Sequence, residues 1–324
     1  MQKLVSILTP CYNGEKFLDD YFFDILEQDY PKCEIIFIDD GSTDGTEKMV
    51  EKYRSLLEKK GYILKYYRQK NAGQGIAIAK GIKEVSGDFL IWPDCDDRLR
   101  HDSISKRVAF LENYPEYGIV RSEGIVVTEE KPDVIIKYVS GKSEHRFSED
   151  IFEDYLFGNC AWLQPGSFMV RTSALDKANP GRYIYPIRYG QNWQMLLPIL
   201  YKFKCGYIDE PLFTYVLHKG SASDNKGKGY SYLISREKMY YEIIVNTLKH
   251  MSIPNRDEYI NRLNIYYNRR YLTVAYKNQE KNEAKKFYLK LKSLNAARII
   301  DFLKMISLNS KISHYFYKRW IEKL

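Results

Sequence analysis

The first hundred residues alternate short apolar runs with amphipathic helical patterns, and this alternation restricts the fold more than any other feature. It predicts strands at residues 5–9, 34–39, 63–67 and 88–92, and helices at 16–27, 44–59 and 74–85. Ser42 and Thr43 are expected to cap the second helix. Strands and helices that alternate in this way form a parallel sheet with crossover helices. An α/β domain is therefore predicted, with helices flanking a sheet.

The rest of the chain divides into three kinds of pattern. Residues 118–139 hold two β-rich segments around the turn-like Lys131-Pro132-Asp133, and they are expected to add strands to the sheet. Residues 158–190 are rich in Gly, Pro, Asn and aromatic residues, which favours a substrate-facing loop region. A helix at 193–202 and a strand at 206–215 follow, and the pattern beyond residue 229 is helical. We therefore predict a first domain at residues 1–224 and a helical region at 225–324.

The net charge of +8 is distributed unevenly along the chain. Residues 225–324 contain 21 Lys and Arg against 8 Asp and Glu, a net charge of +13, so residues 1–224 carry −5. The basic third could meet nucleic acid, anionic lipid or a pyrophosphate-bearing acceptor. Because the first domain is acidic, we expect no nucleic acid to bind there.

Neither cysteine spacing nor hydropathy indicates an exported protein. The five cysteines are scattered, odd in number and without a CxxC pair, which predicts reduced thiols. The apolar stretch at the N-terminus ends at Pro10 and is too short for a signal peptide. No run approaches the roughly 18 apolar residues of a membrane span. The expectation is a cytoplasmic protein, unless something anchors it to a membrane.

Asp39-Asp40-Gly41-Ser42 follows an apolar strand and precedes a helix, a position where α/β proteins bind ligands. A carboxylate there can accept a hydrogen bond from the N3–H of uracil or thymine, which cytosine lacks. Asp40 is therefore a candidate for reading a nucleotide base. The alternative is an Asx turn that leads into a helix N-cap.

Asp94, Asp96 and Asp97 place three carboxylates within four residues, after the apolar strand Phe89–Trp92. Such crowding costs free energy unless a cation is bound, and carboxylate oxygens suit Mg²⁺ or Mn²⁺. The alternative is a solvated acidic loop. Neither GxGxxG nor GxxxxGK follows the first strand, which argues against a dehydrogenase or a P-loop enzyme.

The order and spacing of five motifs resemble those of family 2 glycosyltransferases of the GT-A fold. The motifs are SILTPCYN, FIDDGSTDGT, NAGQGIAIAKGI, SGDFLIWPDCDD and GYIDEPLFTYVLHKGSAS, and they span roughly residues 3–223. The resemblance implies a Rossmann-like mixed sheet, a nucleoside-diphosphate-sugar donor, a divalent metal, and transfer with inversion.

The resemblance also assigns residues position by position. It implies a metal site with Asp96 as the main ligand, assisted by Asp94 or Asp97, and with His218 near the metal or the pyrophosphate. For His218 the alternative is a surface histidine with ordinary hydrogen bonds. The residues implied to bind the donor are Thr9, Pro10, Cys11, Tyr12, Asp40, Gly73, Gln74, Asp94 and Cys95.

Two positions depart from the family pattern. Ile78 stands where the family commonly has an arginine that contacts the donor, and the family's Glu-Asp pair, with its usual general base, falls on Gln191-Asn192. A neutral amide cannot take a proton, although Asn192 can orient a hydroxyl. Glu123 is the predicted alternative base, because it is expected to follow a strand on the acceptor side of the metal loop.

The last stretch, residues 296–324, places apolar side chains among lysines and arginines at near-helical spacing. This pattern suits an interfacial helix on anionic lipid, or a helix that packs on the first domain or on a second subunit. The apolar residues are Ile299, Phe302, Met305, Ile306, Ile312, Tyr315, Phe316 and Trp320.

Together these features predict an enzyme that moves a sugar to a growing, lipid-linked surface glycan at the inner membrane face. Family frequency favours a UDP-hexose or UDP-N-acetylhexosamine donor and Mn²⁺ or Mg²⁺ as cofactor. One rival is a sugar-phosphate nucleotidyltransferase, but TPCYNGEKF is not the glycine-rich, basic loop that it needs. The other rival is a degenerate protein that holds the donor without turnover, which Ile78 and Asn192 motivate.

Overall fold

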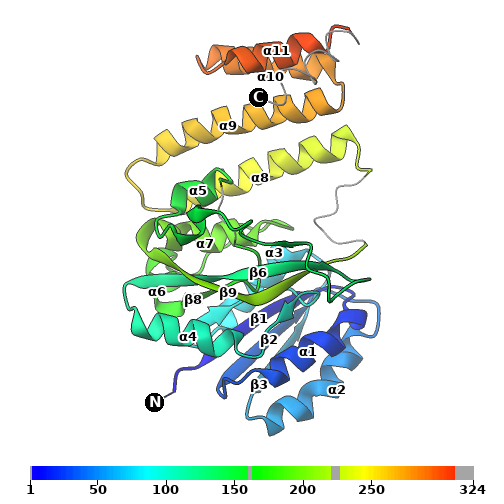
Figure 1. Ribbon diagram of the computed structural model, residues 1–324, viewed down its shortest axis with the longest axis vertical. Helices are drawn as coiled ribbons and strands as arrows, with labels where there is room; N and C mark the ends of the chain where they lie inside the picture. The colour runs from blue at the N-terminus through cyan, green and yellow to red at the C-terminus, as the bar shows by residue number, and fades with distance from the viewer. Residues whose placement is uncertain (1, 160–162, 220–226, 311–324) are drawn as a thin grey trace. The chain divides into compact units, whose positions relative to one another are not determined.

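The structure is a computed structural model that describes residues 2–159, 163–219 and 227–310 (Figure 1). The chain divides into two compact units, Met1–Ser221 and Ala222–Leu324. The predicted boundary at residues 224 and 225 lies outside the described residues.

The described residues of the first unit form one nine-stranded mixed sheet. Its strands follow the order β3-β2-β1-β4-β8-β6-β9-β5, with β7 paired to β6. Pairs among β1 to β4 are parallel, whereas β8 runs antiparallel to both β4 and β6. The strands are β1 Val5–Cys11, β2 Cys33–Asp39, β3 Ile63–Arg68, β4 Phe89–Ile91, β5 Arg98–Leu99, β6 Tyr117–Thr128, β7 Lys137–Tyr138, β8 Phe168–Arg171 and β9 Lys204–Leu217.

Helices flank this sheet, as predicted (Figure 1). The first of them has Leu18, Tyr21, Phe22 and Ile25 at helical spacing, and all four are buried against the sheet. The α-helices of this unit are α1 Leu18–Glu27, α2 Thr46–Lys59, α3 Gln74–Gly81, α4 Ser103–Asn113, α5 Phe152–Leu156, α6 Thr172–Ala178 and α7 Gln191–Lys202. Short 3₁₀ turns are η1 Glu15–Phe17, η2 Ile82–Glu84 and η3 Glu144–Phe147.

The four predicted strands and three predicted helices of the first hundred residues are all present, with ends displaced by at most four residues. The expected caps Ser42 and Thr43 are wrong, because α2 begins at Thr46. The Asp44 carboxylate accepts hydrogen bonds from the backbone N–H and the hydroxyl of Thr46 instead. The turn between β2 and α2 is thus longer than the sequence suggested.

The interpretation of residues 158–190 as a loop region is wrong in its middle. Phe168–Arg171 is β8, a central strand, and α6 follows it directly. Three apolar residues followed by an arginine show no alternation and are too few to predict a strand. The strand β8 is instead stabilised by pairing with β4 and β6 on either side. Residues 158–190 therefore contain a strand of the sheet that the local sequence does not reveal.

The described part of the second unit is helical, as predicted. It consists of α8 Tyr230–His250, α9 Arg256–Lys277, α10 Lys281–Ser293 and α11 Ile299–Ser307. The buried Glu237 carboxylate of α8 accepts two hydrogen bonds from Arg270 of α9, at 2.6 and 2.8 Å. None of the described helices is both long enough and apolar enough to cross a lipid bilayer.

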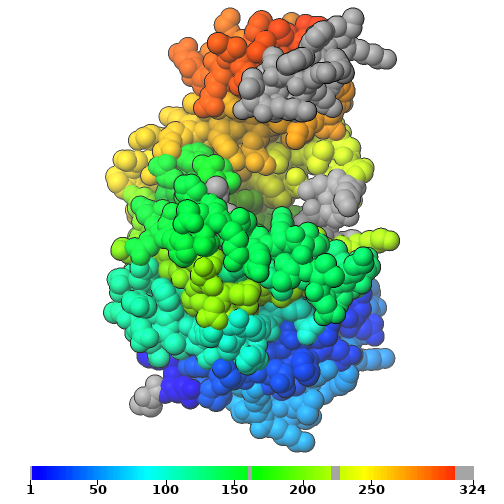
Figure 2. All heavy atoms as spheres, in the orientation of Figure 1, coloured from blue at the N-terminus to red at the C-terminus, as the bar shows by residue number. Residues whose placement is uncertain are grey.

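Helix α11 packs through polar side chains and exposes apolar ones. Asp301 is fully buried and accepts a 3.1 Å hydrogen bond from Arg269, while Lys304 donates to Thr273, so this side of α11 faces α9. Ile299 is 80% exposed and Phe302 is 43% exposed. Side chains of α11, orange-red in Figure 2, lie at the molecular surface. Residues 312, 315, 316 and 320 of the predicted apolar pattern lie outside the described residues.

Candidate active site

The carboxyl ends of three neighbouring strands, β2, β1 and β4, bring the predicted site residues together. Parallel pairing places Cys11 at the end of β1 opposite Asp39 at the end of β2. On the other side of β1, the pairing of Ile7 with Ile91 leads β4 into residues 92–97. Since the strands run in the same direction, the loops that follow them meet at one edge of the sheet.

The carboxylates of Asp94, Asp96 and Asp97 offer oxygen atoms that all lie within 4.8 Å of one another. Burial, and then the charge of Asp96, raise the pKa of Asp94 to about 8 and that of Asp97 well above its usual range. Asp97 Oδ1 accepts a 3.1 Å hydrogen bond from the Val216 N–H, but the buried Asp97 Oδ2 has no hydrogen-bond partner among the described residues. A divalent cation would satisfy that oxygen and relieve the repulsion, so the residues present fit Mg²⁺ or Mn²⁺.

His218 follows β9 and contacts the acidic cluster directly. Its Nε2 lies 2.8 Å from Oδ2 of Asp96, and its ring centroid lies 4.8 Å from that of Phe17. The imidazole therefore orients Asp96 through one carboxylate oxygen and leaves the other free of this contact. The alternative of a surface histidine with ordinary hydrogen bonds does not describe this residue, because the His218 side chain is only 7% exposed and its partner is a carboxylate of the acidic cluster.

Asp40 binds the backbone of the loop that precedes α3. Its Oδ1 accepts hydrogen bonds from Gln69 Nε2 and the Ala72 N–H, and its Oδ2 accepts one from the Gly73 N–H. The Asx turn of the alternative interpretation does not form at Asp40. The neighbouring Asp39 carboxylate accepts a 2.7 Å hydrogen bond from the Ser42 N–H, three residues on, whereas an Asx turn closes two residues on. An N-cap role for Asp40 is excluded, because α2 begins six residues later.

The segment at residues 69–75, a loop and the start of α3, joins Asp40 to the acidic cluster. Gly73, which donates to Asp40, has φ +98°, and a Cβ there would lie 2.7 Å from atoms of Arg188. The next residue, Gln74, donates a 2.5 Å hydrogen bond to Asp94. Gly73 and Gln74 thus lie between the predicted base-reading and metal-binding carboxylates.

Arg188 is a residue of this site that the sequence analysis did not identify. Its backbone carbonyl accepts from the Gly75 N–H at 2.9 Å, and its guanidinium donates to Asn71 Oδ1 at 2.8 Å. No carboxylate among the described residues forms an ion pair with it. Ile78, in contrast, is fully buried beneath this loop. A lone arginine in an irregular segment gives no local signal, so only the contact across 117 residues reveals Arg188.

The residues after β1 differ in their exposure. Thr9 is fully buried, and its hydroxyl pairs with the Tyr21 hydroxyl at 2.7 Å, so its side chain belongs to the core beneath the predicted nucleoside pocket. Pro10 is also buried, whereas Tyr12 is 53% exposed and is the residue of this group that offers an open ring face. The Thr9 side chain thus packs toward Tyr21 of α1, and the placement of Thr9 at a nucleoside pocket stays a prediction.

Cys11 and Cys95 contact each other. The Cys95 thiol donates to the Cys11 sulfur, with 3.3 Å between the two Sγ atoms. This hydrogen bond, and then burial, raise the pKa of the Cys95 thiol well above its ordinary value. Gly14 packs against both sulfurs, because a Cβ at this position would lie 2.3 Å from Cys11 Sγ and 3.2 Å from Cys95 Sγ.

Gln191 and Asn192 form the first turn of α7, after Gly190 with φ +81°. Asn192 Oδ1 accepts a 2.7 Å hydrogen bond from the indole of Trp92, two residues before Asp94. Gln191 is buried, and its Oε1 has no hydrogen-bond partner among the described residues. The tertiary fold thus brings Asn192 beside the acidic cluster.

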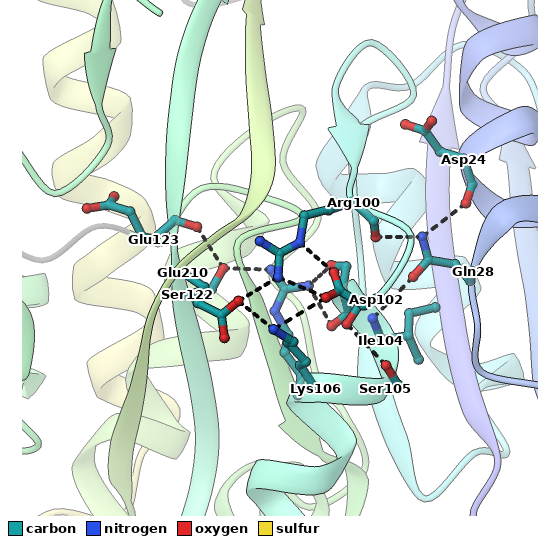
Figure 3. Close-up of polar contacts among 12 residues, drawn as sticks. Asp24, Gln28, Arg100, Asp102, Ile104, Ser105, Lys106, Ser122, Glu123 and Glu210 are labelled. Carbon is teal, nitrogen blue, oxygen red and sulfur yellow. Dashed lines mark hydrogen bonds and ion pairs between the residues drawn. The ribbon is translucent and has the colours of Figure 1, made fainter.

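The premise for Glu123 as base is wrong, because this residue lies inside β6 rather than after a strand. Its side chain is buried, and its carboxylate accepts hydrogen bonds from the backbone N–H groups of Gly124 and Ser140 and from the Ser140 hydroxyl. Figure 3 shows this carboxylate pointing away from the ion pairs that Arg100 and Lys106 make with Glu210. These contacts give Glu123 a structural role in holding the segment after β7.

Comparisons with known proteins agree with this geometry. Residues 6–178, more than half of the chain, match the model of the family described as glycosyl transferase family 2. A putative teichuronic acid biosynthesis glycosyltransferase, TuaG of Bacillus subtilis, is 26% identical over 69% of this chain and 83% of its own length.

Two solved structures share the fold. Staphylococcus aureus TarS 1-349 in complex with UDP-GlcNAc superposes with a TM-score of 0.64 at 16% identity, over 97% of this chain and 91% of that one. A mannosyltransferase from Pyrobaculum calidifontis, solved with GDP-Man and Mn²⁺, gives 0.55 at 16% identity, over 99% and 88%. The chain therefore belongs to glycosyl transferase family 2 and is a glycosyltransferase with the GT-A fold.

Proposed function

We propose that this enzyme moves a hexose or an N-acetylhexosamine from a UDP-sugar to a growing surface glycan, with inversion at the anomeric carbon. The observation that carries the proposal is the connection of Asp40 to Asp94 through consecutive residues, Gly73 and Gln74. A base-reading carboxylate and a cation-binding cluster correspond to the two ends of a nucleoside diphosphate. The UDP-GlcNAc of the TarS complex and the teichuronic acid context of TuaG support the donor and acceptor classes.

Asp40 would read the uracil ring. Its Oδ1 already accepts two hydrogen bonds, whereas Oδ2 accepts only the one from Gly73. A carboxylate oxygen has two lone pairs, so Oδ2 can accept the N3–H of uracil as well. The amides of Ala72 and Gly73 fix the carboxylate in place for this contact.

Arg188 would supply the positive charge that Ile78 cannot. A donor diphosphate needs cations, and Arg188 has an exposed guanidinium beside the segment at residues 69–75, where its neighbour is the neutral amide of Asn71. Arg188→Met should weaken UDP binding about tenfold and leave uridine binding unchanged. Arg54→Met, on α2 with Glu51 as its partner, is the matched control. Equal losses for UDP and uridine would exclude a phosphate contact.

Asp94, Asp96 and Asp97 would hold Mn²⁺ or Mg²⁺, and the ion, when bound, would neutralise charge on the leaving diphosphate. The chain positions each carboxylate separately. Gln74 holds Asp94, the imidazole of His218 holds Asp96, and the Val216 N–H holds Asp97. Each keeps at least one oxygen free of these contacts for the cation.

Asn192 would orient the acceptor hydroxyl. Its Oδ1 is engaged by Trp92, and its amide group lies at the start of α7, beside the strand that leads to Asp94. A neutral amide can hold a hydroxyl by a hydrogen bond but cannot remove its proton. This position would therefore set acceptor geometry without acting as the base.

The acceptor would be lipid-linked, and the enzyme would work at the cytoplasmic face of the membrane. The exposed apolar residues Ile299 and Phe302, on a helix that belongs to a region of net charge +13, support contact with an anionic lipid surface. A second copy of the chain, forming a homodimer, is the alternative occupant of this face.

A screen of nucleotide sugars tests the proposal. The enzyme should release UDP from UDP-hexoses or UDP-N-acetylhexosamines in the presence of Mn²⁺ or Mg²⁺, and EDTA should stop the release. The anomeric configuration of the product, read by NMR, tests inversion. Tight donor binding without product from any donor and acceptor pair would favour the degenerate, non-catalytic alternative that Ile78 and Asn192 motivate.

A further inference from the structure

The thiol pair Cys11–Cys95 lies within the candidate active site, and neither the metal cluster nor the base-reading role uses it. Cys11 ends β1, and Cys95 lies between Asp94 and Asp96. Their sulfur atoms are 3.3 Å apart, although 84 residues separate them in the sequence. A disulfide has an S–S distance of about 2.05 Å, so the two sulfurs need to approach by little more than an ångström.

The surroundings of the two thiols favour a reaction of Cys11 and Cys95 with each other over a reaction of either with another cysteine. Cys11 is 3% exposed, and Gly14 packs against both sulfurs, so Cys33 and Cys205, the other described cysteines, cannot reach it without unfolding. Cys95 is partly exposed and is the more accessible of the two. Cys33 and Cys205 are both buried. Among the described cysteines, Cys11 and Cys95 are the two whose sulfur atoms are in contact, as formation of a disulfide requires.

We propose that Cys11 and Cys95 form a reversible modification site, in which a low-molecular-weight disulfide oxidises the two thiols to an intramolecular disulfide. The Cys95 thiol gives up its proton and its sulfur attacks one sulfur of the oxidant; the S–S bond of the oxidant breaks, and the first small thiol leaves with that proton. The Cys11 sulfur then attacks the Cys95 sulfur of the mixed disulfide, and the second small thiol leaves. The two cysteines lose two electrons and two protons, and the oxidant becomes two thiols.

The bond would inactivate the donor site. It would tie the residue between Asp94 and Asp96 to the end of β1, so these carboxylates could no longer adjust around a cation. Mg²⁺ tolerates little departure from octahedral geometry, so a small displacement of a ligand weakens its binding. This consequence depends on the proposed donor and metal function, whereas formation of the disulfide does not.

The test treats the folded full-length chain with oxidised glutathione. Peptide mapping should identify one cross-link, between the Cys11 and Cys95 peptides. The affinity for UDP with Mn²⁺ should fall about tenfold or more, and dithiothreitol should restore it. Cross-links that join other cysteines, or glutathione mixed disulfides alone, would overturn the proposal.

Two variants make the result specific. Cys205→Ala removes a buried thiol outside the pair, and oxidation should affect this variant as it affects the wild type. Cys95→Ser and Cys11→Ser should each have the same UDP affinity before and after oxidation, whatever that affinity is. A loss of affinity in these serine variants equal to that of the wild type would overturn the proposal. Reduced wild-type protein that binds no UDP would instead contradict the proposed function, and the cross-link would still be measurable.

Discussion

The indole N–H of Trp92 donates a 2.7 Å hydrogen bond to Oδ1 of Asn192, across 100 residues of sequence. This bond ties the segment that leads into the acidic cluster to the first turn of α7. It fixes the amide oxygen of Asn192, at the position where the family usually has its general base. A carboxylate at residue 192 could keep the Trp92 bond through one oxygen and present the other to an acceptor.

Asn192→Asp should therefore raise the turnover number. A positioned base typically contributes about a hundred- to ten-thousand-fold, and the substitution should recover part of that range because Trp92 already orients the group. Steady-state kinetics with saturating donor and acceptor would measure it. Asn192→Ala, which removes the hydrogen-bonding group, should mainly raise the KM for the acceptor. Lower turnover in the aspartate variant would show that the site works through another base.

Glu123→Gln should lower the melting temperature and leave turnover near the wild-type value. The amide places an N–H₂ donor where the buried carboxylate accepts from Ser140 and Gly124, so one of these bonds is lost. Calorimetry and kinetics below the melting transition separate the two effects. A turnover number reduced about a hundredfold, with donor affinity unchanged, would restore Glu123 as the base.

Asp96→Ala should abolish the dependence of UDP binding on the divalent cation. The remaining Asp94 and Asp97 are held by Gln74 and Val216 and cannot bridge a diphosphate by themselves. Titration calorimetry of UDP with Mn²⁺ and with EDTA, on both proteins, checks this. Asp102→Ala, which removes a carboxylate paired with Arg100 away from the cluster, is the control. Wild-type affinity that is equal with and without the ion would remove the metal from the mechanism.

Asp40→Asn should reduce the preference for UDP over CDP. The amide can present either an oxygen to uracil N3–H or an N–H₂ group to cytosine N3, so discrimination falls by about 1 to 3 kcal/mol. A loss of loop stability alone would lower the affinity for both nucleotides and leave their ratio unchanged. Competition binding of UDP and CDP therefore separates base reading from the structural contacts with Ala72 and Gly73.

Ile299→Ser with Phe302→Ser should reduce sedimentation with anionic vesicles while the melting temperature stays constant, since both side chains are exposed. Phe23→Ser removes an exposed aromatic side chain of α1 and should have no effect on vesicle binding. Truncation from Ala296 is a poorer test, because it also removes Asp301 from Arg269. If sedimentation with vesicles is unchanged but the variant no longer dimerises, the exposed side of α11 would be assigned to contact with a second copy of the chain.

Much of the first unit follows from local pattern. Fully buried strands such as β1 and β2 leave continuous apolar runs, and the helices between them leave a 3.6-residue period, so both elements are visible in short windows. The positions of Asp40 and Asp94 at strand ends follow from the same reading. The strand β8 was not predicted, because four residues contain too little periodicity and the neighbouring strands in the sheet decide its conformation.

The sequence by itself determined the α/β architecture, the helical C-terminal region and the acidic cluster, because the strands, helices and acidic run that compose them each show their pattern within a short window of consecutive residues. Only the tertiary structure decided that Glu123 is buried in a strand, that Arg188 lies against the segment at residues 69–75, and that Cys11 contacts Cys95. Each of these facts depends on strand register and on loop packing between residues far apart in the chain. A contact of that kind is set by the whole sheet, and no local window contains it.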